Sequence, residues 1–189
     1  MSNLDLALSV ALGVGLAAAT GFRLFLPLLI LSGAAYTGHV SLNESFAWPA
    51  AIIMLGTAAI AEIAAFYIPG VDNLLDTLAM PGAVVAGTIA SAAAMSDLPP
   101  MVKWTTAVIA GGGVAGITQG LTAMLRAKST VLTGGLGNSV IATAELGGAS
   151  LISLLALATP LAALAVVILF FWSAFRLIRR LASFCRETL

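Results

Sequence analysis

The sequence predicts an all-α fold, a polytopic bundle of helices that cross a membrane. Three observations predict it. Of the 189 residues, 60% are hydrophobic and only 8% are charged, whereas about 25% of the residues of a soluble domain carry charge. The mean hydropathy is +1.09. Several apolar stretches also reach the roughly 20 residues that a helix needs to cross the hydrocarbon core.

Six stretches are predicted to span the membrane: residues 5–33, 48–68, 80–96, 104–126, 138–159 and 161–179. Pro49, Pro81 and Pro160 lie at or near the starts of three of them, where a helix loses least by lacking a backbone N–H. Residues 180–189 are expected to continue the last helix out of the bilayer. We therefore treat residues 1–189 as one transmembrane domain with a short tail.

The basic residues predict an orientation. With six spans both termini share a side, and the basic residues near the ends of the fourth and sixth spans lie on that side, against Lys103 on the other. They are Arg126, Lys128, Arg176, Arg179, Arg180 and Arg186. Because basic loops stay in the cytoplasm, we expect both termini to be cytoplasmic, and residues 180–189 to form a basic cytoplasmic tail.

Small residues predict where helices pack. The first and fourth spans each carry small residues four apart, which share one helix face and let backbones approach closely. They are Gly13, Ala17 and Gly21, and Gly112, Gly116 and Gly120. Aligning the two sets makes the first three spans resemble the last three, which suggests an inverted 3+3 repeat. The glycines at 111–113 also suggest an unwound or hinged segment.

Three ionisable residues fall at membrane depth: Arg23, Glu62 and Glu145. A charge that faces lipid is costly, so we expect Arg23 to face the interior and to pair with Glu62, Glu145 or helix-end carbonyls. Two interpretations stay open. The charges form a structural ion pair that fixes helix register, or they line a polar cavity for a proton, a cation or an anionic head group. Four polar residues either line such a cavity or serve helix contacts: Thr20, Thr118, Gln119 and Thr143.

The segment between the second and third spans carries a second polar group. Asp72 and Asp76 lie one turn apart in VDNLLDTL, which predicts a short amphipathic helix at the inner interface. The two carboxylates either cap that helix and face water or the basic residues Arg126 and Lys128, or they form a cation site at the mouth of a cavity.

Composition narrows the class of function. One cysteine, Cys185, and one histidine, His39, leave little material for a disulfide framework, a CxxC metal site or a Ser–His–Asp triad. We therefore expect no enzymatic activity and no cofactor. The formal net charge of zero gives no reason to expect a nucleic-acid partner. Membrane lipids are the expected partners, and the glycine faces suit a homo-oligomer.

The segments ATGFRLFLPLLILSG, EIAAFYIPGVDNLLDT and LRAKSTVLTGGLGNS, the last followed by Glu145, resemble a bacterial membrane-protein family catalogued as domain of unknown function 4126. The resemblance covers about residues 10–155. Non-ionisable residues stand where that family often has charged ones: Ala65, Phe66, Met80 and Leu146. These departures argue against a highly charged, metal-like site. The resemblance implies one compact domain in a bacterial membrane and supplies no activity.

Together these observations favour a small inner-membrane transporter or channel-like permease for an ion or small polar solute. Arg23, Glu62 and Glu145 would form its polar centre, and Asp72 and Asp76 would guard the cytoplasmic mouth. One alternative is the binding or translocation of a lipid or isoprenoid head group, with Arg23 on the phosphate. The other is a structural membrane subunit that transports nothing.

Overall fold

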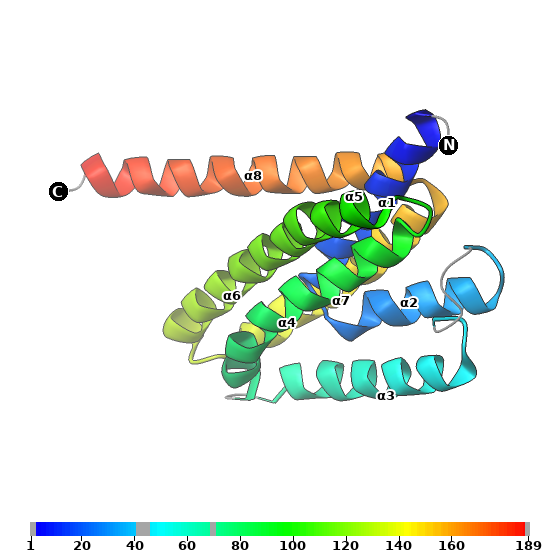
Figure 1. Cartoon of the computed structure of the whole chain (residues 1–189). Coiled ribbons are helices and arrows are strands. Elements are labelled where there is room, and N and C mark those ends of the chain that lie inside the picture. The colour runs from blue at the N-terminus through cyan, green and yellow to red at the C-terminus, as the bar shows by residue number, and fades with distance from the viewer. Residues whose placement is uncertain (1–2, 41–45, 69–70, 188–189) are drawn as a thin grey trace.

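The computed structural model describes residues 3–40, 46–68 and 71–187, and within these ranges the side chains of residues 4–179 except 73, 177 and 178. All regular structure in these ranges is helical. The elements are α1 (Asn3–Thr20), α2 (Phe25–Tyr36), α3 (Pro49–Phe66), α4 (Val71–Ala94), α5 (Pro100–Thr106), the π-helix η1 (Ala107–Gly112), α6 (Gly113–Thr133), α7 (Asn138–Ala158) and α8 (Pro160–Glu187). Figure 1 shows them as one elongated bundle.

Four helical stretches are long and apolar enough to cross a membrane: Pro49–Phe66, Leu74–Ala94, Pro100–Thr133 and Asn138–Ala158. Shorter apolar helices cover Leu4–Thr20, Phe25–Tyr36 and Pro160–Arg176. These lengths and compositions support a helical membrane protein. The predicted count of six spans is not confirmed.

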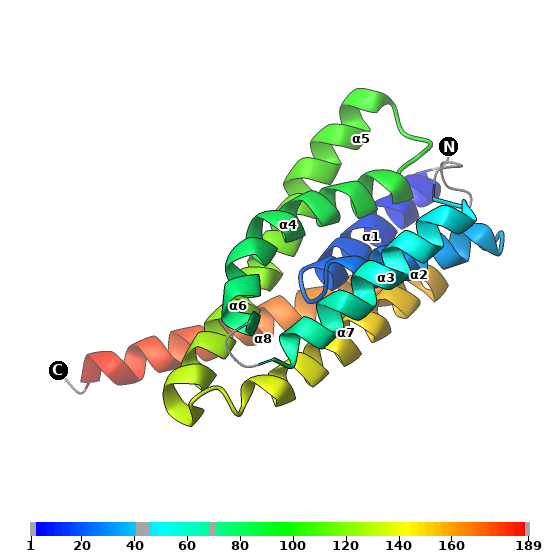
Figure 2. The same ribbon diagram turned by 90° about the horizontal axis from the view of Figure 1, so that it is seen from below.

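The first predicted span, residues 5–33, is a helical hairpin. Gly13 of α1 lies against Met95, just after the end of α4, whereas Leu24 at the start of the returning arm lies against Gly82, in the middle of α4. The two arms therefore run in opposite directions along α4, as both views show (Figures 1 and 2). The one span predicted over residues 5–33 is therefore replaced by two shorter arms.

Proline explains why α1 cannot continue. Pro27 lies in the first turn of α2, and a proline ring clashes with the carbonyl group four residues earlier if the helix runs through that position. That carbonyl belongs to Arg23, so the helix stops before it. In the turn that follows, the N–H groups of Gly21 and Phe22 donate hydrogen bonds to the carbonyls of Ala17, Ala18 and Ala19. Arg23 lies at the tip of the hairpin.

The hairpin changes the topology. The Asn3 end of α1 and the Glu187 end of α8 lie at opposite ends of the bundle (Figure 1). The described residues therefore do not meet the expectation that the two termini share one side. The inverted repeat is not confirmed either, because the first half opens with a hairpin, whereas the stretch Pro100–Thr133 is continuously helical over 34 residues.

The predicted small residues lie where helices meet. Cβ atoms built at Gly112 and Gly116 would lie 3.2 Å and 2.9 Å from side-chain carbons of Val84 in α4, and one at Gly13 would lie 2.8 Å from the Ser91 hydroxyl oxygen in the same helix. Gly120 faces Met80 of α4, whereas Gly21 packs on Thr118 of α6, and Ala17 is fully buried. The helix α4 is thus the surface on which α1 and α6 both pack.

The glycines at 111–113 do not unwind the helix. The backbone instead widens into the π-helix Ala107–Gly112 and continues without a break into α6. A short π segment inserts an extra residue per turn and re-aims the side chains that follow it. The expectation of an unwound segment is therefore replaced by a widened one.

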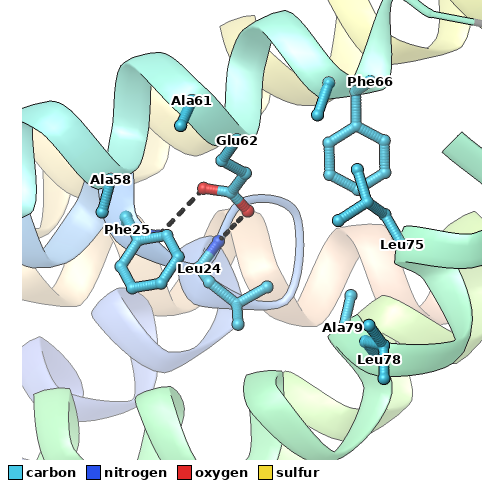
Figure 3. A pocket seen from close by; sticks show the side chains of 10 residues that line it. Leu24, Phe25, Ala58, Ala61, Glu62, Phe66, Leu75, Leu78 and Ala79 are labelled. Atoms are coloured by element: carbon cyan, nitrogen blue, oxygen red, sulfur yellow. Dashed lines mark hydrogen bonds between the residues drawn. The ribbon is translucent and has the colours of Figure 1, made fainter. Parts of the chain in front are cut away.

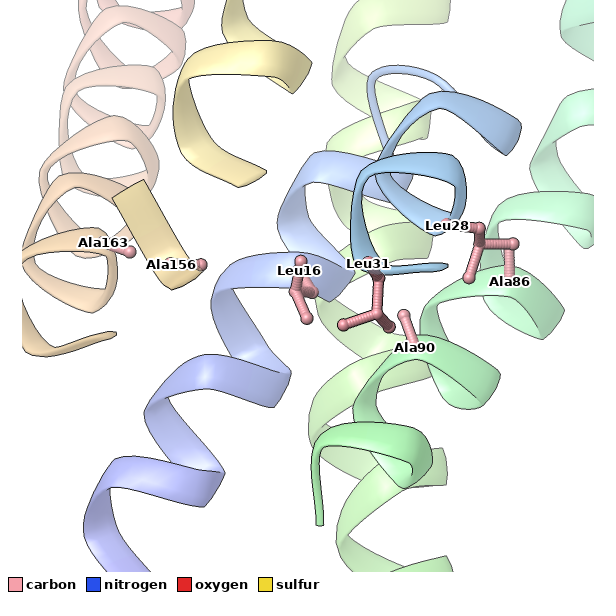
Figure 4. Close-up of a cluster of buried hydrophobic side chains, with 7 residues drawn as sticks. All are labelled: Leu16, Leu28, Leu31, Ala86, Ala90, Ala156 and Ala163. Atoms are coloured by element: carbon pink, nitrogen blue, oxygen red, sulfur yellow. The ribbon is translucent and has the colours of Figure 1, made fainter. Parts of the chain in front are cut away.

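The hairpin rests on a core of small and branched residues. Buried side chains from α1, α2, α4, α7 and α8 form one cluster (Figure 4): Leu16, Leu28, Leu31, Ala86, Ala90, Ala156 and Ala163. Because alanine lets neighbouring backbones come close, α1 and the returning α2 both fit inside the bundle. This packing holds the tip with Arg23 inside the bundle.

Candidate functional site

Arg126 of α6 joins two carboxylates of other helices. Its Nε donates a hydrogen bond of 3.2 Å to Oε1 of Glu145 in α7, and its Nη2 contacts the second oxygen, Oε2. On the other side, Nη1 lies 3.1 Å from Oδ1 of Asp76 in α4. Arg126 is completely buried and Glu145 nearly so. Three helices are therefore tied together by one guanidinium.

Arg23 reaches the same glutamate from the tip of the hairpin. Its Nη2 lies 3.6 Å from Oε2 of Glu145 and donates a hydrogen bond of 2.9 Å to the carbonyl of Ala142. The side chain is 0% exposed. Its Nε and Nη1 atoms have no hydrogen-bond partner among the described residues. Arg23 thus faces the interior, as expected, but it is much less fully paired than Arg126.

An aromatic ring belongs to the same cluster. The guanidinium carbons of Arg23 and Arg126 each lie 4.1 Å from the centroid of the Phe66 ring. Such contacts are worth about 0.5–2 kcal/mol, with the larger values for desolvated sites. Phe66 therefore helps to hold two like charges in one buried cluster.

Glu62 has a different role from the expected one. Its two oxygens accept hydrogen bonds from the backbone N–H groups of Leu24 (2.7 Å) and Phe25 (3.0 Å), so that it caps α2 from α3 (Figure 3). The first N–H groups of a helix have no partner within the helix, and a carboxylate there is also stabilised by the helix dipole. No ion pair joins Glu62 to Arg23 within the described residues.

Asp72 and Asp76 are not on a separate interfacial helix. The helix α4 begins at Val71 and runs through Pro81 to Ala94, so the predicted short helix and the predicted start of the third span near 80 are both wrong. Asp72 is 2% exposed and accepts a 2.5 Å hydrogen bond from Nδ2 of Asn138. A proline inside a membrane helix is tolerated where neighbouring helices or side chains satisfy the freed backbone groups.

The remaining predicted polar residues divide into two groups. Gln119 joins the cluster, since its Nε2 lies 3.4 Å from Oδ1 of Asp76. The hydroxyls of Thr20 and Thr118 instead donate to carbonyls of their own helices, and Thr143 contacts the hydroxyl of Tyr67 on the outside. Within the described residues, no group of three or more His, Cys, Asp or Glu side chains has an arrangement that could hold a metal ion.

Sequence reasoning did not place Arg126 in the centre. The sequence predicts it as an orienting charge at the end of the fourth span, and as a possible partner of Asp72 and Asp76 from the inner loop. The spacing of polar residues could have indicated this position. Gln119, Thr122 and Arg126 lie three and four residues apart, on one helix face, and all three are buried. A polar stripe of that period on a membrane helix indicates an interior-facing surface.

A cavity of about 410 Å³ lies between α3 and α4 (Figure 3). Most of its walls are alanine and leucine side chains, and Phe66 forms part of them. Glu62 is the single ionisable residue of the lining, and both its oxygens are engaged by α2. The cavity therefore offers an apolar interior that lies next to a charged cluster.

Comparisons with known proteins point to one family. Nothing matches among the curated proteins or among the solved structures. A family model described as "Domain of unknown function (DUF4126)" matches residues 10–180, which extends the resemblance seen in the sequence to nearly the whole chain. The chain therefore belongs to this family, domain of unknown function DUF4126.

Proposed function

We propose that the chain is a small permease of the bacterial inner membrane, which moves an ion or a small polar solute and catalyses no reaction. The observation that carries this proposal is the buried network of Arg23, Glu145, Arg126 and Asp76. Removing such ions from water costs several kcal/mol each, and charged groups at membrane depth commonly mark transport paths.

The polar contacts run along the bundle. At one end, where α6 gives way to α7, Asn138 bonds to Asp72 and to Thr130. Deeper in the bundle lie Asp76 and Glu145, each against Arg126. A cation or a proton that reaches either carboxylate competes with Arg126 for the same oxygen atoms. Binding would thus be coupled to the breaking of contacts between α4, α6 and α7.

Flux through proteoliposomes tests the proposal. The purified chain should carry at least one member of a panel of ions, protons and small polar solutes. Asp76→Asn should lower that flux about tenfold or more, because it removes one charged partner of Arg126. The matched control is Asp97→Asn, since Asp97 is exposed and lies outside the cluster. Uptake of nothing in the panel by the wild-type chain would overturn the proposal.

The orientation that goes with this proposal differs from the one expected for six spans. The end that carries Lys128, Arg176 and Arg179 is placed in the cytoplasm by the distribution of basic residues. The hairpin, which sets the Asn3 end of α1 and the helix α5 opposite that end of the bundle, supports an outer location for both.

A further inference from the structure

The cavity between α3 and α4 and the charged cluster share one side chain. Phe66 lines the cavity (Figure 3), and its ring centroid lies 4.1 Å from the guanidinium carbons of both Arg23 and Arg126. The ring is only 3% exposed. Rotation of this one aromatic side chain would therefore connect the cavity with the two guanidinium groups.

Arg23 has hydrogen-bonding capacity left over. Its Nε and Nη1 are buried without a hydrogen-bond partner among the described residues, and its ion pair with Glu145 is long, at 3.6 Å. Both oxygens of that glutamate are already engaged by Arg126. Leaving charged donors unpaired is unfavourable, so an additional anionic oxygen beside Arg23 would be stabilising.

The cavity itself suits an apolar chain. Most of its walls belong to two stretches that are long and apolar enough to span a membrane, Pro49–Phe66 and Leu74–Ala94, and Leu24 and Phe25 at the start of α2 complete them. At its margin, Ala61 is exposed and Leu78 is 63% exposed, so the cavity is open to the surroundings of the bundle. Glu62 adds no free polar group, because both its oxygens accept bonds from α2. An occupant at this depth would come from the hydrocarbon region.

We propose that this cavity binds an anionic phospholipid of the surrounding bilayer, with an acyl chain between α3 and α4 and the phosphate on Arg23. The Phe66 side chain lies between the acyl-chain cavity and Arg23, and it rotates aside when the phosphate reaches Arg23. An anionic lipid is favoured over a zwitterionic one, because the donors without a partner in the described part of the chain, Nε and Nη1 of Arg23, belong to a cation, whereas the oxygens of Glu62 and Glu145 are already engaged and leave no acceptor for a cationic head group. This lipid site is independent of the proposed transport activity, since it requires binding alone.

Native mass spectrometry of the full chain tests the head-group preference. Phosphatidylglycerol and phosphatidylcholine with the same acyl chains are titrated against detergent-purified protein. We expect phosphatidylglycerol to bind about tenfold more tightly, a difference of about 1.4 kcal/mol. Equal affinities would overturn the proposal. Stronger binding of a fatty acid or a polyprenyl phosphate in the same assay would overturn the assignment to a phospholipid.

Two substitutions on α3 test the location. Ala61→Trp fills the cavity from its margin, whereas Ala64→Trp adds the same side chain at an exposed position that does not line the cavity. We expect Ala61→Trp to lose the tight phosphatidylglycerol binding and Ala64→Trp to keep it. Equal binding by the two variants would place the lipid elsewhere. Both residues lie on the exposed surface of α3, so neither substitution disturbs the buried charges.

Arg23→Gln tests the head-group contact. This variant should bind phosphatidylglycerol and phosphatidylcholine equally, whereas retained preference would remove Arg23 from the site. Because the substitution also leaves Glu145 with one cation fewer, folding is checked by circular dichroism, and the two tryptophan variants decide the location if this protein is unfolded. Flux measured on Ala61→Trp separates the two proposals: lipid binding lost with flux kept leaves the permease standing.

Discussion

Arg126 is the residue around which the buried charges are arranged. Its guanidinium binds both oxygens of Glu145, lies against Asp76 and stacks on Phe66, and Arg23 adds a second cation to Glu145. A carboxylate this deeply buried is stable only while a cation accompanies it. Neutralising Arg126 alone should therefore lower the free energy of unfolding more than neutralising Arg126 and Glu145 together.

We predict that Arg126→Gln lowers the free energy of unfolding by about 3–5 kcal/mol, because Glu145 and Asp76 are left with an uncompensated charge. Lys128→Gln is the matched control, since Lys128 is exposed two residues further along the same helix, and it should change stability by less than about 0.5 kcal/mol. Unfolding of the purified variants in mixed micelles by sodium dodecyl sulfate measures both.

A double substitution sharpens the result. Arg126→Gln combined with Glu145→Gln removes a charge of each sign, so it should be less damaging than the sum of the two single changes. Additive losses, or equal losses for Arg126→Gln and Lys128→Gln, would show that the ion pair contributes nothing to folding.

Among the helices, α4 and the segment from η1 to α6 approach most closely. A Cβ atom added at Gly111 would lie 2.5 Å from Cβ of Ser91 and 2.8 Å from the backbone oxygen of Gly87. Two residues further on, a Cβ atom at Gly113 would meet nothing within 4 Å. Neighbouring glycines thus have different roles, one in packing and one without a contact.

This contrast predicts opposite effects of the same substitution. Gly111→Ala should destabilise the protein by about 1–3 kcal/mol, because the two backbones must move apart. Gly113→Ala should be neutral or stabilising by up to about 1 kcal/mol, since alanine favours a helix over glycine. Thermal unfolding midpoints in detergent compare them. A midpoint for Gly111→Ala at or above that of Gly113→Ala would contradict the close approach.

For the chain as a whole, the hairpin sets where the described ends of the chain lie in the bundle. Because α1 begins and α2 ends at the same end of the bundle, the Asn3 end of α1 lies at the opposite end from the Glu187 end of α8 (Figure 1). The basic end of α6 and the beginning of α8 likewise lie at opposite ends of the bundle. An even number of full crossings would require α1 and α2 to form one continuous helix.

Cysteine labelling tests this topology. In a Cys185→Ser background, single cysteines replace the exposed residues Leu4, Met101 and Leu136. We expect a membrane-impermeant maleimide added to spheroplasts to label the cysteines at 4 and 101 and to spare the one at 136 until the membrane is opened. Labelling of positions 4 and 136 from the same side would restore six full crossings.

Local features of the sequence predicted the apolar helices and the burial of the charges. An apolar stretch of sufficient length partitions into the bilayer whatever its neighbours do. The burial of Arg23 also followed, because a guanidinium in hydrocarbon is costly. Each of these inferences uses one segment at a time.

The hairpin, the position of Arg126 and the stacking of Phe66 were decided only by tertiary structure. Pro27 stops α1 locally, but the return of the chain depends on Glu62, 38 residues from Leu24, which caps α2. The sequence predicts Arg126 at the end of a span, beside an inner loop. In the structure α6 continues to Thr133, so Arg126 lies within the helix and its side chain is buried beside Glu145 and Asp76. Such contacts join residues far apart in the chain, and their free energy depends on distances that exist only once the helices have packed.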